Sequence, residues 1–221
     1  MKQETAIQKT HEFLKDKFSG KGSSNDYWHT YRTWKMAQYI AAREPDADLF
    51  TVELAALLND VADWKFNDGD LKAGPRAARD WLEELGVDEA IITHVEAIIL
   101  NAPFKGAGVM SQLDTLEGKI VHDADKLDAI GAIGIGRAFA YGGMKGRPLH
   151  DPTRKPELHE SFEAYRQNDT AENSTINHFY EKLLLLKSRM LTKTGKAIAE
   201  HRHLVMEQFL QEFFAEWEGK R

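Results

Sequence analysis

The chain contains no cysteine among its 221 residues. This absence excludes disulfide bonds, thiolate nucleophiles and cysteine-ligated zinc, so any bound metal must be held by His, Asp, Glu or Asn side chains. It also fits the reducing cytoplasm, which is the compartment that we expect. With 42% hydrophobic residues, the chain can bury a core stabilised by packing alone, and its length predicts one domain rather than two.

Long apolar runs are absent too. The first residues, MKQETAIQKTHEF, lack the apolar core of a signal peptide. No uncharged stretch approaches the roughly 20 apolar residues of a membrane span. We therefore expect a soluble protein with no membrane partner.

The chain has no excess of positive charge, since its formal net charge is −6. This net negative charge argues against a broad basic surface that binds duplex nucleic acid, although a small basic pocket could still hold one phosphorylated molecule. We expect small partners rather than polymers. The sequence leaves the oligomeric state open, with a homodimer among the options.

Apolar periodicity predicts an all-α fold. Apolar residues recur at three- and four-residue spacing along most of the chain, glycine and proline punctuate the pattern (for example at Gly74-Pro75), and no convincing series of strands occurs. The predicted helices cover residues 7–18, 27–40, 52–58, 77–85, 91–100, 116–129, 176–190 and 197–217.

We expect these helices to form a single domain over residues 1–221. Its core would lie roughly at residues 25–140, with C-terminal helices at 174–218 packed on it. Between them, residues 141–173 lose the periodicity and are rich in glycine and proline, which is long for a structureless connection. Because such segments often form walls or lids of sites, this loop is a candidate lid.

The first polar interruption of a helix pairs His29 with Arg32. Three-residue spacing places both side chains on one helical face, where a metal ligand and a phosphate-binding fork could act together. A lone histidine on an apolar face is, however, more often a hydrogen-bonded core residue.

The second is Asn59-Asp60, directly after the apolar run Ala55–Leu58. Neighbours on a helix diverge by about 100°, so these two side chains could converge on one point only near a helix end. Asp63, one turn beyond Asp60, would then reach the same space. Alternatively Asn59 and Asp60 could cap a helix, and for Asn59 both roles remain open.

The third is the run from His122 to Asp128, which brings carboxylates among apolar residues. Buried carboxylates need a metal, a cation or several hydrogen bonds. Asp123 and Asp128 could serve only as caps or partners of cations. Lys126, with its acidic neighbours, is interpreted as a solvated surface charge.

Taken in order, these residues resemble the motif of the HD superfamily of metal-dependent phosphohydrolases. That motif has a histidine on one helix, a His-Asp pair ending the next, and a later Asp; His29, Asn59-Asp60 and Asp125 occupy these positions. The resemblance extends to a subgroup of small bacterial and fungal HD proteins, the YedJ-like proteins. The shared landmarks are Tyr27 to Arg32, Ala55 to Phe66, Leu116 to Phe139, His178 to Leu186 and Glu216 to Gly219.

The resemblance implies an HD-type helical bundle and an enzyme that hydrolyses a phosphorylated small molecule, with a nucleotide favoured. One divalent ion (Mn, Mg, Co or Ni) would polarise a phosphoryl oxygen and activate a water for attack at phosphorus. The implied metal ligands are His29, Asn59, Asp60 and Asp125. The implied catalytic residues are Asp60 and, as the general base, Asp63. The candidates to neutralise phosphate charge are Arg32, Lys65, Lys126 and Arg137.

This chain departs from the family pattern at Asn59, where members ordinarily carry the histidine ligand. A carboxamide oxygen is a neutral, hard donor, whereas imidazole binds the later transition metals better. The alternative function is therefore a non-catalytic nucleotide- or phosphate-binding HD protein with weakened or lost turnover. A second departure is His122, at a position where a glutamine is expected, which could offer a substitute imidazole.

Overall fold

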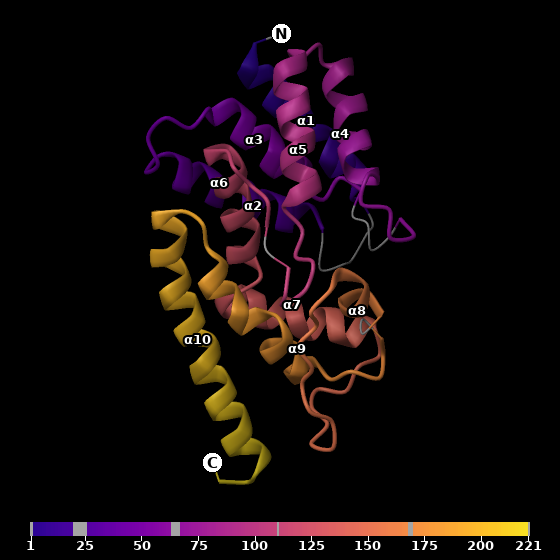
Figure 1. Ribbon diagram of the computed structural model, residues 1–221, viewed down its shortest axis with the longest axis vertical. Coiled ribbons are helices and arrows are strands. Elements are labelled where there is room, and N and C mark those ends of the chain that lie inside the picture. Colours follow the sequence, from indigo (N-terminus) through magenta and orange to yellow (C-terminus); the bar gives the residue numbers. More distant parts are fainter. Residues whose placement is uncertain (1, 20–25, 63–66, 110, 168–169, 221) are drawn as a thin grey trace. The chain divides into compact units, whose positions relative to one another are not determined.

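The computed structural model describes the whole chain except residues 1, 20–25, 63–66, 110, 168–169 and 221. Every regular element of the described residues is a helix, and no strand occurs among them (Figure 1). The predicted all-α class is therefore confirmed. None of the described helices has the length and apolar character that crossing a membrane requires.

The chain divides into two compact units. The first comprises Met1–Phe104 and Ser111–Asp125, and the second Lys105–Met110 and Lys126–Arg221. The helices of the first unit are α1 (Gln3–Lys17), α2 (Tyr27–Ala41), α3 (Leu49–Leu58), α4 (Ala73–Glu84), α5 (Glu89–Asn101) and α6 (Leu116–Asp128), whose last turn belongs to the second. The second unit continues with α7 (Gly131–Met144), α8 (Phe162–Gln167), α9 (Thr175–Glu181), the 3₁₀ helix η2 (Leu183–Arg189) and α10 (Lys193–Trp217). The single domain expected over residues 1–221 stays a prediction.

Helix α3 is the centre of the first unit. Eight of its ten residues are buried, and α1, α2 and α5 all contact it. Asp48 caps its start by accepting hydrogen bonds from the backbone N–H groups of Phe50 and Thr51. A helix that is apolar on nearly every side must lie inside a protein, so polar residues at its end are held at the edge of the core.

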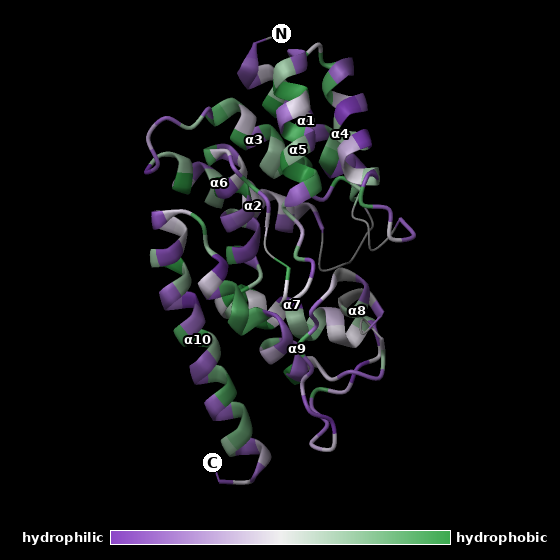
Figure 2. Cartoon of the chain, viewed as in Figure 1, coloured by the Kyte–Doolittle hydropathy of each residue, from purple (hydrophilic) through white to green (hydrophobic). Residues whose placement is uncertain are grey.

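Helix α10 has the opposite character. In Figure 2 hydrophilic and hydrophobic residues alternate along its length. Ala199, Met206 and Leu210 are buried, whereas Glu200 and Glu207 are exposed. This is the pattern of a helix that buries one face.

Several boundaries differ from the prediction. The expected stop at Gly74-Pro75 lies inside the first turn of α4, where a proline is tolerated because its missing N–H would have no helical partner. The expected helix 176–190 is a short α-helix and a 3₁₀ helix separated by Lys182, whose φ of −141° and ψ of −60° are not helical. The candidate lid at 141–173 begins with the last turn of α7 and contains α8.

Helix α7 was not predicted, because its glycines obscure the apolar spacing. Gly131 adopts a φ of +75° just as the helix begins, a conformation that favours glycine. A Cβ at Gly134 would collide with the carbonyl oxygen of Ala129. The approach of the Ala129 backbone thus explains Gly134, whereas a Cβ at Gly136 would meet nothing.

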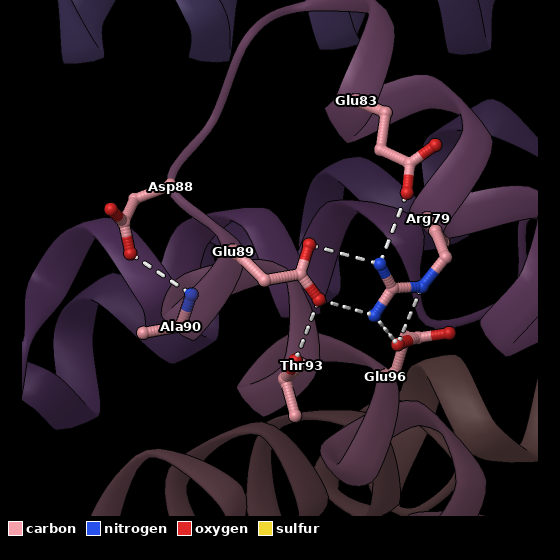
Figure 3. Close-up of polar contacts among 7 residues, drawn as sticks. All are labelled: Arg79, Glu83, Asp88, Glu89, Ala90, Thr93 and Glu96. Atoms are coloured by element: carbon pink, nitrogen blue, oxygen red, sulfur yellow. Dashed lines mark hydrogen bonds and ion pairs between the residues drawn. The ribbon is translucent and has the colours of Figure 1, made fainter.

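An ion-pair network links α4 to α5 (Figure 3). The guanidinium of Arg79 contacts three carboxylates: Glu83 at 3.0 Å, Glu89 at 2.9 Å and Glu96 at 2.5 Å. Hydrogen bonds from Arg79, and secondarily from Thr93, lower the pKa of Glu89, while the three carboxylates raise the pKa of Arg79. The network therefore favours the charged forms of its members in the folded state.

Replacing Arg79 by Gln should lower the melting temperature at pH 7 by roughly 1–5 °C, a small change because exposed ion pairs contribute little. A carboxylate whose folded pKa is depressed stabilises the fold above its unfolded pKa, and this contribution is lost as pH falls. The difference between wild type and Arg79→Gln should therefore begin to shrink as pH falls below about 4.3, vanish only below the lowered pKa of Glu89, and shrink in high salt. Arg76→Gln, which removes a single pair with Asp70, should have a smaller effect. Thermal unfolding with equal melting temperatures for all three proteins at pH 7 would contradict this.

Candidate metal site

Three helical segments of the first unit bring one imidazole and two carboxylates together. His29 Nε2 on α2 lies 3.0 Å from Asp60 Oδ2, just beyond α3, and 3.5 Å from Asp125 Oδ1 on α6. One ligand atom from each residue falls within 4.8 Å of the others, and no second group of this kind occurs among the described residues. His29 is only 3% exposed, whereas both carboxylates are 19% exposed. The group therefore has a buried imidazole and two carboxylates that solvent or a ligand can reach.

Local structure explains how α2 and α3 present their site residues. Asp26 caps α2 by accepting the backbone N–H of His29 at 2.9 Å, which holds the histidine in the first turn. Helix α3 ends at Leu58 and Asn59 is its C-cap, with helical φ and ψ. Asn59 and Asp60 therefore lie at a helix end, which is the condition that convergence of their side chains requires.

The second nitrogen of His29 also has a partner. Its Nδ1 lies 3.5 Å from the hydroxyl oxygen of Thr33, one turn along α2 and 1% exposed. If Nε2 binds a metal, Nδ1 must carry the proton and can donate it to this hydroxyl. The sequence analysis missed Thr33; its only signal was four-residue spacing from His29.

Replacing Thr33 by Val should weaken manganese binding about tenfold, since outer partners of metal-bound histidines fix the tautomer and the ring orientation. The change keeps the side-chain shape, so the melting temperature of the metal-free protein should move little. Thr30→Val is the matched control, because Thr30 is equally buried on the same helix and no contact with His29 is described for its hydroxyl. If calorimetric titration gives Thr33→Val and Thr30→Val equal affinities for manganese, Thr33 has no role in metal binding.

Asn59 carries an unsatisfied polar atom. Its side-chain oxygen Oδ1 is buried and accepts no hydrogen bond within the described part of the chain. An oxygen left in this state costs free energy unless a donor or a cation faces it. Asn59 directly precedes Asp60 in the chain, so this orphaned oxygen is a candidate fourth ligand, as the family resemblance predicts.

A bound cation accounts for these donors better than protonation of the histidine does. One N–H at His29 Nε2 can be directed to only one acceptor at a time, although two carboxylate oxygens lie within 3.5 Å of this nitrogen. Protonation of His29 also leaves Asn59 Oδ1 without a described donor. A divalent ion accepts oxygen and nitrogen ligands from several sides at once. The residues therefore fit a metal ion: one imidazole, one amide oxygen and two carboxylates.

The remaining predicted residues have different environments. Arg32 lies one turn after His29 on α2 and is half-buried. Asp63 and Lys65 fall outside the described residues. Lys126, interpreted as a surface charge, is only 4% exposed, so that interpretation is wrong: it follows Asp125 on a helix whose surrounding residues are almost all buried.

Arg137, the last phosphate candidate, lies on α7 in the second unit. Its Nη1 forms an ion pair with Asp128 at 2.7 Å and also donates to the backbone carbonyl of that residue. Of the two roles expected for Asp128, helix cap or partner of a cation, the structure shows the second. Any contact of Arg137 with phosphate would compete with this pair.

His122 is not a member of the metal group. Its Nδ1 lies 3.1 Å from the carboxylate of Asp123, and the two side chains are 2% and 0% exposed. This pairing gives Asp123 a cation or hydrogen-bond partner inside the core. The described geometry therefore offers no substitute imidazole for Asn59.

A buried histidine on α2, a carboxylate just after α3 and a carboxylate on α6 of an all-α protein follow the order of the HD motif. The HD domain model matches residues 27–130. The Bacillus subtilis protein YpgQ is 34% identical over 213 residues, which cover 96% of this chain and 94% of YpgQ. The chain therefore belongs to the HD superfamily, as the resemblance predicted.

Solved structures agree with this assignment. An HD-superfamily hydrolase from Bacillus thuringiensis is 41% identical with a TM-score of 0.73, covering 98% of this chain and 99% of its own. A Lactobacillus plantarum protein is 36% identical with a TM-score of 0.85, covering 99% and 100%. YpgQ in complex with ADP is 31% identical with a TM-score of 0.75, covering 98% and 97%. These relatives share essentially the full length of the chain.

Proposed function

We propose that this protein is a metal-dependent phosphohydrolase that acts on a phosphorylated small molecule, specifically a nucleotide. The observation that carries the proposal is the grouping of His29, Asp60 and Asp125 within 4.8 Å of one another. Membership of a superfamily with hydrolases supports the reaction class. The ADP complex of YpgQ supports a nucleotide as the ligand.

The ion would be held by His29 Nε2, Asn59 Oδ1 and the carboxylates of Asp60 and Asp125. When bound, it would supply Lewis acidity toward a phosphoryl oxygen and make a water more acidic. The two carboxylates give the donor set a formal charge of −2 when ionised, which favours a divalent cation. Asn59 makes the set harder than an imidazole would, so magnesium and manganese are the favoured ions.

Other residues of the chain would handle the phosphate and the proton. Arg32, half-buried on the same helix as His29, would neutralise phosphate charge with its planar fork of N–H donors. Lys65, Lys126 and Arg137 are further candidates for this role. Asp63 would accept the proton of the attacking water, as the family resemblance implies.

A second candidate function is favoured by one observation. Asn59 stands where the family carries a histidine ligand, so this chain could bind nucleotides without turning them over. Arg32 and the two carboxylates would then recognise a metal–nucleotide complex and nothing would be hydrolysed.

A hydrolysis screen separates the two functions. The full chain is incubated with nucleoside mono-, di- and triphosphates and with manganese, magnesium, cobalt or nickel, and released phosphate and pyrophosphate are measured. We expect release that depends on the added metal and stops with a chelator. Metal-dependent nucleotide binding without release would establish the binding protein instead, and neither binding nor release would refute both.

A further inference from the structure

Helix α2, which carries His29 of the candidate metal site, also carries exposed aromatic side chains. Trp28 is 60% exposed and Tyr31 is 37% exposed, and we call this pair the aromatic shelf. Their ring centroids lie 5.9 Å apart at an interplanar angle of 80°. The ring of Tyr27 contacts both members of the pair, with its centroid 5.3 Å from that of Trp28 and 6.4 Å from that of Tyr31. Large aromatic rings that neighbouring rings hold in place, and that solvent reaches, are typical of binding surfaces.

Helical geometry fixes the position of Trp28 relative to His29 around the axis of α2. Arg32 is four residues from Trp28 and three from His29, so it neighbours both on the helix surface. At about 100° per residue, Arg32 falls between them around the helix axis. Burial follows the same order, from His29 at 3% exposed through the half-buried Arg32 to Trp28 at 60%. Around its circumference α2 thus presents a metal ligand, a guanidinium and an aromatic ring.

This order matches the chemistry of one class of ligand. A metal ion and a guanidinium recognise a phosphate group, and an exposed ring recognises a flat π surface. A nucleoside phosphate carries both parts, joined by the ribose. A sugar phosphate or inorganic pyrophosphate carries only the first.

We propose that Trp28, held edge-on by Tyr31, stacks on the base of a bound nucleotide and makes the site prefer nucleoside phosphates over base-free phosphates. The proposal rests on the proposed function, because it places the phosphate at the metal site. Every base has a π face, so stacking of this kind tolerates different bases. The site should therefore accept purine and pyrimidine nucleotides alike.

Paired titrations test this directly. ADP and inorganic pyrophosphate, each with manganese, are titrated into wild type, Trp28→Ala, Trp28→Phe and Tyr39→Ala. Trp28→Ala should weaken ADP binding about tenfold and leave pyrophosphate binding unchanged, because one stacked base is lost. Trp28→Phe keeps a ring and should restore most of the ADP affinity. Tyr39, also aromatic and exposed on α2, lies about three turns away and should not matter.

Fluorescence gives a second readout that a purely structural role would not move. ADP should quench part of the emission of the five tryptophans, and this part should disappear in Trp28→Phe although ADP still binds. Equal losses of ADP and pyrophosphate binding in Trp28→Ala, or no loss of either, would overturn the proposal; no loss of either would leave the shelf to a protein partner. If wild type binds neither ADP nor pyrophosphate, the proposed function fails. If wild type binds both but Trp28→Ala shows no selective loss of ADP binding, only the stacking proposal fails and the proposed function stands.

Discussion

Replacing Asp125 by alanine is expected to abolish metal-dependent hydrolysis. Its carboxylate lies 3.5 Å from His29 Nε2 and would be one of two anionic ligands. Losing it should lower kcat/KM at least about 1000-fold, since metal ions stabilise charge in such reactions by several kcal/mol. Initial rates at saturating manganese, with phosphate and pyrophosphate followed together, provide the measurement.

The same variant should fold at least as well as wild type. Removing Asp125 relieves the repulsion between two neighbouring carboxylates when no metal is bound. Its melting temperature in chelator should therefore be unchanged or higher, while the stabilisation by added manganese should be lost. Asp114→Ala is the matched control, because Asp114 is an exposed carboxylate shortly before α6. A full rate in Asp125→Ala would exclude this residue from catalysis.

Replacing Asn59 by histidine should strengthen binding of manganese, cobalt and nickel relative to magnesium. Imidazole is a better ligand than a carboxamide for these metals, whereas magnesium prefers oxygen. We expect the manganese-to-magnesium affinity ratio to rise by at least about tenfold, which corresponds to roughly 1.4 kcal/mol. Hydrolysis with manganese should rise with it. Calorimetric titration of both metals supplies the ratio.

Two further variants make this result interpretable. Asn59→Ala removes the side-chain oxygen that is buried without a described partner, and it should weaken binding of every metal. Asn101→His makes the same chemical change at the end of α5 and should alter nothing. An unchanged ratio in Asn59→His would mean that residue 59 does not face the ion. Turnover by Asn59→His alone would identify this chain as a binding-only member of the superfamily.

The sequence predicted the helices that carry this site because their apolar spacing is regular. Helix α3 is the clearest case, since nearly all of its residues are apolar and buried. The order of His29, Asp60 and Asp125 then predicted their convergence, and the structure brings these three side chains together. Their role as ligands stays a prediction.

Three features could not be predicted from the sequence. Lys126 has carboxylates as chain neighbours, which suggests solvent, but burial depends on the elements packed around α6 and not on adjacent residues. The contact between Thr33 and His29 Nδ1 depends on the rotamer of His29, which the sequence does not reveal. Helix α7 was missed because glycine weakens apolar periodicity, although the nearby carbonyl group of Ala129 leaves no room for a side chain at Gly134.

Anomalous diffraction from crystals equilibrated with manganese would test the metal site most directly. We predict one manganese ion per chain, within bonding distance of His29 Nε2, Asn59 Oδ1 and the carboxylates of Asp60 and Asp125, and its loss in Asp125→Ala. A peak bound by other residues, or no peak at concentrations that support hydrolysis, would contradict the assignment of these four residues.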